Sequence, residues 1–292
     1  MSILVHLGLL TGLIVFFLWW TRRHRLRMLA TVEEIILADV QATGLANSRD
    51  IVVYLPPGYR KHIDKAYDVL YVNDGQERDA LDLRGALARL TLKGKIRPII
   101  VVVIPTNANR IQEYGTACCP NSRGLGADAA AYSAFVVHEL KPLIDKKFRT
   151  RSPAALTGVS LGGLSAFDIV WNNPYDFNTV GAMSGSFWWN TATTEDWPAE
   201  DPRIAHAMVR GSQYIEGFRG WFQAGTRDEV SDRDNDGVID AIQDTTELIE
   251  ELTRLGYRPG VDLKYVEMPS GRHDYQTWAK VMPDFLIWAF SP

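Results

Sequence analysis

Cysteine is scarce in this sequence of 292 residues: it has two, Cys118 and Cys119, and they are adjacent. Neighbouring cysteines rarely meet the geometry of a disulfide, and no Cys-x-x-Cys or His/Cys zinc spacing is present. A fold held by disulfides is therefore excluded. The sequence also lacks an excess of charge of one sign, since its net charge is −4, which argues against a nucleic-acid partner.

No internal repeat and no low-complexity linker interrupts the chain, and its 46% apolar content is enough for a large core. After the first strands, apolar strand patterns alternate with helical ones. This alternation predicts an α/β fold of the α/β-hydrolase type, with a mostly parallel central sheet covered by helices on both faces. The strands are expected at 32–43, 50–55, 68–73, 99–105, 154–157, 179–183, 220–224 and 262–267, and the helices at 80–93, 127–147, 161–173, 241–255 and 275–290.

The long apolar run lies at the N-terminus, from Ile3 to Trp20, and is followed by four arginines. Eighteen helical residues span about 27 Å, close to a bilayer core, and no small-x-small cleavage site follows. We therefore expect residues 1–30 to form a single-pass membrane anchor with a basic stalk, and residues 31–292 to form the catalytic domain. The arginines after the apolar run favour a catalytic domain in the cytoplasm, whereas the acidic loop described below favours an extracytoplasmic one. Of the two, we expect the extracytoplasmic side.

The most informative stretch is Gly158-Val159-Ser160-Leu161-Gly162, which fits the nucleophile elbow Gly-x-Ser-x-Gly. A short apolar strand pattern precedes it and a helical pattern follows it, as the motif requires. The sharp turn lifts the Ser160 hydroxyl clear of the sheet and directs the Leu161 N–H toward the same space. We predict Ser160 as a nucleophile and Leu161 N–H as one oxyanion donor.

A serine nucleophile needs a histidine base and a carboxylate that orients it. In the order typical of this elbow, Asp228 follows the strand pattern of residues 219–224, and His273 follows that of residues 262–268. We predict Asp228 as the acid, with Glu229 as the alternative, and His273 as the base. The remaining histidines fit surface or packing positions.

With these residues in order, the sequence resembles the putative esterase, or esterase D, family of α/β-hydrolases. The resemblance spans residues 50–290. The matching stretches are Val69 to Gln76, Arg110 to Tyr114, Gly158 to Gly163, Met183 to Trp189, Gly225 to Asp228 and Gly271 to Trp278. None of them is specific to one substrate.

The resemblance implies further site residues. The backbone N–H of Gln76 is the second oxyanion donor, and Arg110, Tyr114 and Trp188 line the acyl or alcohol pocket. One of the two adjacent tryptophans, Trp188 and Trp189, is expected to pack in the core, because successive residues of an extended chain point to opposite sides.

An acidic loop begins four residues after Asp228. Asp232, Asp234 and Asp236 occupy the first, third and fifth positions of a calcium loop, with a glycine at the sixth and the Val238 carbonyl at the seventh. The twelfth position is a glutamine, so either Asp240 or Asp244 is expected to complete the ligand set. We predict a structural calcium ion here and no cofactor for the chemistry.

Together these features predict a serine carboxylic-ester hydrolase that forms an acyl-enzyme and acts on a small-molecule or carbohydrate ester. Two alternatives stay open. An acyltransferase would use the same residues with an alcohol in place of water. A non-catalytic, membrane-tethered binding domain would retain the fold without the chemistry.

Overall fold

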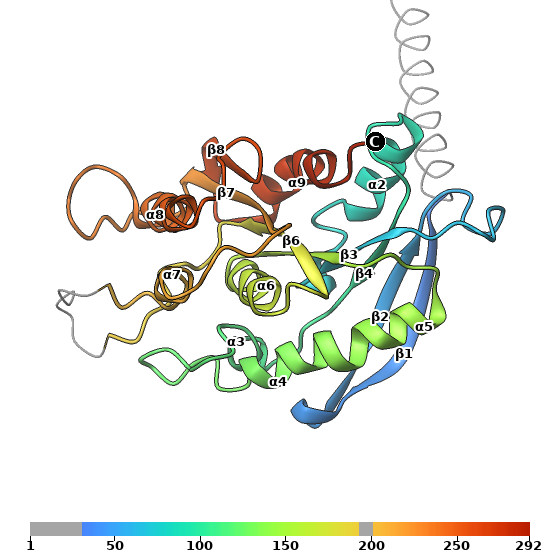
Figure 1. Ribbon diagram of the computed structural model, residues 1–292, viewed down its shortest axis with the longest axis horizontal. Helices are drawn as coiled ribbons and strands as arrows, with labels where there is room; N and C mark the ends of the chain where they lie inside the picture. The colour runs from blue at the N-terminus through green and yellow to red at the C-terminus, as the bar shows by residue number, and fades with distance from the viewer. Residues whose placement is uncertain (1–30, 193–200) are drawn as a thin grey trace, which may run out of the picture.

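The apolar runs of the sequence become the strands of one eight-stranded sheet in the computed structural model, which describes residues 31–192 and 201–292 (Figure 1). The strand order is β1-β2-β4-β3-β5-β6-β7-β8. The strands are β1 (Glu33–Ala42), β2 (Asn47–Leu55), β3 (Asp68–Val72), β4 (Ile99–Val103), β5 (Ala154–Val159), β6 (Phe177–Met183), β7 (Arg219–Arg227) and β8 (Leu263–Arg272).

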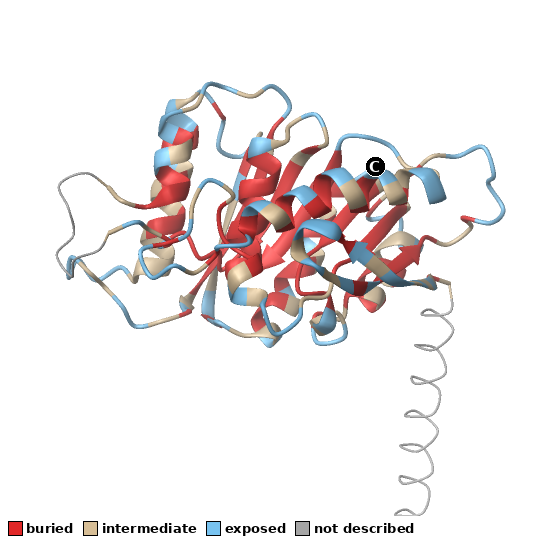
Figure 2. Ribbon diagram, turned by 90° about the horizontal axis from the view of Figure 1, so that it is seen from below, coloured by how far each residue is buried: buried red, intermediate tan, exposed pale blue. Residues whose placement is uncertain are grey.

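The sheet is antiparallel only at its first edge. β1 pairs with β2 and β2 with β4 in antiparallel fashion, and every later pair, from β4–β3 to β7–β8, is parallel. The central strands β4 and β5 are buried along their whole length, whereas the edge strand β1 alternates between more and less exposed residues (Figure 2). This difference follows from helices covering both faces of the parallel part.

Two apolar clusters fill the space between the sheet and its helices. One joins α2 and α9 to one face, and the other joins α4, α5, α6, α7 and α8 to the opposite face (Figure 1). The described helices are α2 (Leu83–Leu92), α3 (Arg110–Glu113), α4 (Ala129–Ala134), a π-helical segment (Phe135–Leu140), α5 (Lys141–Lys147), α6 (Leu161–Asn172), α7 (Ile204–Arg210), α8 (Asp240–Arg254) and α9 (Tyr275–Phe290); short 3₁₀ turns lie at Thr43–Leu45 and Gly75–Glu77.

The predicted strands and helices are present, with ends that shift by a few residues, and the short helix α3 lies where no helix was predicted. Two elements differ more. The helix expected at 127–147 contains the π-helical segment Phe135–Leu140 in its middle. The strand expected to end at residue 267 continues as β8 to Arg272, through Pro269 and the irregular Ser270 with φ 57°. Proline is tolerated there because β8 is an edge strand, so one side of its backbone needs no partner in the sheet.

The expectation of a single-pass membrane location is corrected. Between residues 31 and 192 and between 201 and 292, no helix has the length and apolar character needed to cross a bilayer. The apolar segment on which that expectation rested, Ile3 to Trp20, lies outside the described residues. The described residues therefore do not support a membrane anchor or the membrane as a partner.

Candidate active site

The parallel strands bring their carboxyl ends to one edge of the sheet, and Ser160 lies there between β5 and α6. Its backbone is in a strained conformation, φ 54° and ψ −126°, and its N–H donates to the Met183 carbonyl at 2.9 Å. A side chain at Gly158 would overlap the Gly162 carbonyl, so the turn requires glycine at that position. These features are those of a nucleophile elbow, which holds the serine hydroxyl above the sheet.

His273 reaches this serine from 113 positions further along the chain. Its Nε2 lies 2.8 Å from the Ser160 Oγ, a hydrogen-bond distance. The imidazole follows β8 directly and packs edge-on against Trp278, with 5.0 Å between ring centroids. His273 is exposed to solvent in part. Partial burial lowers the pKa of His273 below its usual 6.5, although the Asp228 carboxylate opposes this shift. The imidazole is therefore neutral at pH 7, as a general base must be.

Asp228 follows β7 and is 8% exposed. Its Oδ2 accepts a hydrogen bond from Gly225 N–H at 2.9 Å, while its Oδ1 has no hydrogen-bond partner in the part of the chain that the structure describes. Burial raises the pKa of Asp228, and the Gly225 N–H, the Ser184 hydroxyl and His273 act against that rise. The carboxylate thus interacts with His273 through its charge, without a formed hydrogen bond.

The alternative acid, Glu229, is not among the groups that shift the pKa of His273. Its Oε1 is buried without a partner in the described structure, and burial raises its pKa. It lines a cavity of about 260 Å³ with Trp188, Asn190, Ser231, Arg233 and Asp240. The electrostatic influence on His273 therefore favours Asp228 over Glu229 as the carboxylate that acts on the imidazole.

Ser184, which the sequence analysis did not single out, lies in contact with this group. It follows β6 with φ 47°, and its Oγ accepts a hydrogen bond from Trp278 Nε1 at 2.9 Å. The same Trp278 packs against His273, and the Ser184 hydroxyl lowers the pKa of Asp228. The signal available in the sequence was its place in the Met183-Ser-Gly-Ser stretch at the end of a strand.

The turn after β3 is fixed beside the elbow. Asn73 donates from its side chain to the Gly162 carbonyl at 2.9 Å, and Asp74 adopts φ 57°. The buried Asp74 carboxylate accepts two hydrogen bonds from Arg110, at 2.6 and 2.8 Å, and the Asp74 N–H donates to the Tyr114 hydroxyl at 3.0 Å. These bonds hold the backbone that leads to Gln76 against the start of α6.

The two amides expected to bind an oxyanion lie on these two turns. Gln76 is in the 3₁₀ turn after Asp74, and Leu161 is the first residue of α6. No hydrogen bond from either N–H to another described residue is present. Amides at the start of a helix lack an intrahelical acceptor, so both N–H groups are available to a ligand.

The three residues expected to line the substrate pocket have different environments. Trp188 is 43% exposed, while its neighbour Trp189 is buried. Arg110 is partly exposed and faces Asp74. Tyr114 is fully buried beneath Arg110, with 5.1 Å between the guanidinium carbon and the ring. The expectation for Tyr114 is therefore corrected: the side chain supports Asp74 and does not line an open pocket, because its hydroxyl is occupied by the Asp74 N–H.

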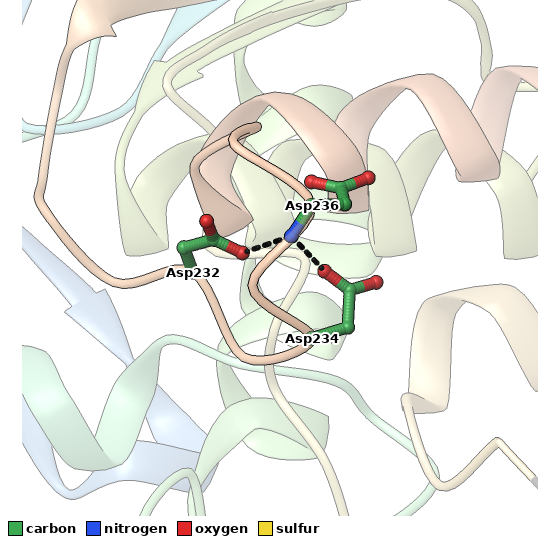
Figure 3. A group of neighbouring side chains, drawn as sticks. All are labelled: Asp232, Asp234 and Asp236. Atoms are coloured by element: carbon green, nitrogen blue, oxygen red, sulfur yellow. Dashed lines mark hydrogen bonds between the residues drawn. The ribbon is translucent and has the colours of Figure 1, made fainter.

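The acidic loop brings together three of its five predicted ligands. Ligand oxygens of Asp232, Asp234 and Asp236 lie within 4.8 Å of one another, and Asp236 N–H donates to both other carboxylates (Figure 3). The Val238 N–H donates to Asp236 at 2.7 Å. Asp240 does not join the group, because its carboxylate is paired with Arg233.

Asp244, the alternative to Asp240, is also engaged elsewhere. It is buried and accepts hydrogen bonds from Arg203, at 2.6 Å, and from Arg233. Burial raises the pKa of Asp244, and the two arginines counter that rise. The loop is thus tied to α8 and to the start of α7 through ion pairs, while its three-aspartate group faces solvent.

Comparison with known proteins identifies the family. Uncharacterized protein YbbA of Bacillus subtilis is 26% identical over 154 residues, which cover 50% of this chain and 60% of YbbA. The siderophore triacetylfusarinine C esterase of Aspergillus fumigatus is 37% identical over 78 residues, 26% of each chain. The chain therefore spans less than two thirds of these relatives.

Among solved structures, the enterobactin esterase FES from Shigella flexneri superposes with a TM-score of 0.66 at 21% identity, over 88% of this chain and 57% of FES. At that identity the likeness is one of fold. The family model described as "Putative esterase" matches residues 42–289, which is most of the sequence. The chain belongs to the putative esterase family.

Proposed function

We propose that this protein is a serine carboxylic-ester hydrolase whose catalytic unit is residues 31–292. The observation that carries the proposal is the 2.8 Å contact between His273 Nε2 and Ser160 Oγ, at a strained strand-to-helix turn. A serine in hydrogen-bond reach of a neutral imidazole is an activated nucleophile. Membership of the putative esterase family supports the same reaction class.

In the proposed first step, Ser160 Oγ attacks the ester carbonyl carbon while His273 Nε2 takes its proton. The carbon–oxygen bond to the alcohol then breaks, and the imidazolium protonates the departing alkoxide. Water repeats the sequence on the acyl-enzyme and releases the acid. The charge of Asp228 stabilises the imidazolium formed in both steps, since the carboxylate already raises the pKa of His273.

We propose that the Gln76 and Leu161 amides stabilise the negative oxygen of each tetrahedral intermediate. Both amides lack acceptors among the described residues and lie on turns linked by the Asn73–Gly162 hydrogen bond. Losing one such donor typically costs about 3 kcal/mol of barrier. The reaction uses side chains and backbone groups of this chain and needs no cofactor.

The substrate class that we propose is a small-molecule or carbohydrate ester with polar groups near the scissile bond. Partly exposed Arg110 and Trp188 offer a cation and an aromatic face, and the cavity beside Glu229 is lined mainly by polar side chains. One relative is named a siderophore triacetylfusarinine C esterase and one structural neighbour an enterobactin esterase.

We also propose that calcium is the cation of the acidic loop. Three carboxylates with ligand atoms within 4.8 Å repel one another, and a divalent ion bound by oxygen ligands removes that repulsion. The ion would hold the loop between the Asp228 turn and α8 and would take no part in bond breaking.

Replacement of the nucleophile tests the reaction. In the Ser160→Ala variant of the full chain, the rate of p-nitrophenyl acetate hydrolysis should fall by about six orders of magnitude, because His273 and Asp228 have no nucleophile to activate. It should also resist labelling by a fluorophosphonate. Ser291→Ala, at an exposed serine after the end of α9, is the matched control. A folded Ser160→Ala variant that hydrolyses the ester within a few fold of wild type would reject the proposal.

A further inference from the structure

The adjacent cysteines, which the sequence analysis treats as unpaired, converge in the structure. Cys118 and Cys119 lie in the loop between α3 and α4, and their Sγ atoms are 3.1 Å apart. Cys118 is exposed to solvent and Cys119 is partly buried. Two thiols in direct contact, one of them open to solution, form a dithiol that a small oxidant can reach.

The surrounding backbone holds the two side chains in this arrangement. Thr116 and Cys119 pair as an isolated antiparallel bridge, and the Thr116 hydroxyl donates to the Cys119 carbonyl at 3.1 Å. Just beyond, the Asn121 side chain accepts from the Arg123 and Leu125 amides at 2.9 and 3.0 Å. The turn is therefore ordered on both sides of the cysteines, and little chain entropy remains to oppose a bond between the sulfurs.

A bond between these sulfurs would be strained and hence easily reversed. Consecutive Cα atoms are about 3.8 Å apart across a trans peptide, whereas disulfide-linked residues usually have Cα atoms about 4.4–6.8 Å apart. Strained and exposed disulfides have higher reduction potentials than structural ones, and they are the ones found in labile or regulatory positions.

We propose that Cys118 and Cys119 form a redox-modification site that is oxidised by a peroxide to a vicinal disulfide. The Cys118 sulfur attacks one peroxide oxygen, the oxygen–oxygen bond breaks, and a sulfenic acid and one water are formed. The Cys119 sulfur then displaces the sulfenic oxygen as a second water, and the sulfur–sulfur bond closes. Two thiols lose two electrons and two protons, and one hydrogen peroxide becomes two water molecules.

The environments of the two sulfur atoms explain why Cys118 reacts first and Cys119 second. Cys118 is the exposed group and meets the oxidant first. Burial and the neighbouring Cys118 raise the pKa of Cys119 to about 11, so Cys119 is a weak nucleophile toward an oxidant in solution. Its contact with Cys118 compensates, because a reaction between held groups is effectively intramolecular.

The site lies against the helix that begins at Ser160. The Ala117 N–H, directly before the cysteines, donates at 3.0 Å to Asp168 on α6, a buried carboxylate whose pKa burial raises to about 6. Gly115 and Gly126, on either side of the cysteine turn, approach the buried Trp189 ring so closely that a side chain at either would contact it. The modification would therefore occur in a turn that packs against α6 and the Trp189 ring.

Mass spectrometry of the full-length protein tests the proposal. Both cysteines lie in one tryptic peptide, residues 111–123, between Arg110 and Arg123. After brief treatment with hydrogen peroxide, this peptide should lose the mass of two hydrogen atoms and resist alkylation by iodoacetamide. Dithiothreitol should restore both the mass and the alkylation.

The Cys118→Ser and Cys119→Ser variants are the matched controls. Each should gain oxygen or form an intermolecular disulfide, and neither should show the loss of two hydrogens. The proposal is overturned if wild type, under the same treatment, keeps both cysteines open to alkylation, gains oxygen without losing hydrogen, or dimerises through these residues. Circular dichroism before and after treatment separates ring closure from unfolding, and none of these readouts depends on esterase activity.

Discussion

The two sides of the candidate site differ in how completely their polar groups are bonded. On the nucleophile side, the Ser160 amide, the Asn73 side chain and the Asp74 carboxylate all have partners at hydrogen-bond distance. On the acid side, one oxygen each of Asp228 and Glu229 is buried without a partner in the described structure. The nucleophile side is thus preorganised, while the acid side keeps a carboxylate oxygen available for the imidazolium that forms during reaction.

Activity should show this difference most strongly. We expect His273→Ala to lower kcat by ~10⁶-fold and Asp228→Ala by ~10⁴-fold. The imidazole of His273 transfers the proton, whereas the Asp228 carboxylate only stabilises the protonated imidazole. Steady-state hydrolysis of p-nitrophenyl acetate measures both values. Equal losses, or a larger loss for Asp228→Ala, would contradict the view that the acid side is the more loosely coupled one.

Stability should respond in the opposite order. Asp74→Asn leaves Arg110 without its buried partner, and removing one member of such a pair costs about 3–5 kcal/mol of unfolding free energy; the partial exposure of Arg110 places the effect at the lower end. Asp228→Asn removes a charge that burial disfavours, so it should leave stability unchanged or raise it. Urea denaturation measures both.

A matched control is Glu33→Gln, which removes one partner of the exposed pair with Arg60 and should leave stability unchanged. If Asp228→Asn destabilises the protein as much as Asp74→Asn does, the carboxylate on the acid side is bonded as firmly as the one on the nucleophile side.

Metal removal probes the acid side further. If calcium holds the acidic loop, excess EGTA should lower Tm by a few degrees and reduce activity in parallel, because a ligand that binds only the folded state stabilises it. The Asp234→Asn variant should have the low Tm already and respond less to EGTA. Unchanged Tm and activity in the chelator would remove the calcium proposal and leave a solvated acidic turn.

The smallest expected effect concerns pH. Because the pKa of His273 lies below 6.5, the acidic limb of kcat/KM should have its midpoint below that value, with activity lost as the imidazole becomes protonated. Asp274 raises this pKa, so Asp274→Asn should move the limb to lower pH while still accepting the Thr277 N–H that caps α9.

Asp284→Asn makes the same charge change on an exposed position of α9, ten residues further along. That is about 15 Å of helix and beyond the screening length at physiological salt, so the limb should stay in place. A shift of the limb to higher pH in Asp274→Asn would show that the Asp274 carboxylate does not raise the pKa of His273.

Much of the fold follows from local sequence patterns. The apolar runs locate the parallel strands, and the elbow motif locates Ser160, because a strained turn needs glycine at fixed positions. The place of β4 between β2 and β3 does not follow from such patterns, since strand order depends on contacts distant in sequence. Nor does the continuation of β8 past Pro269, which depends on its being an edge strand.

At the site, residue type and chain order were informative, but hydrogen-bond partners were not. Tyr114 fits a pocket wall by its aromatic ring, yet its hydroxyl is used by the Asp74 amide. Asp240 fits a metal ligand by spacing, yet Arg233 binds it. In both cases the competing partner comes from a position that spacing alone does not reveal.

Asp244 is one buried carboxylate shared by two arginines, Arg203 at the start of α7 and Arg233 in the acidic loop. Losing the carboxylate alone would remove the negative charge that both arginines share, and would leave Arg203 with Asp201 and Glu247 and Arg233 with Asp240. Among homologues, these three positions should therefore covary: a neutral residue at 244 should accompany the loss of at least one of the two positive charges.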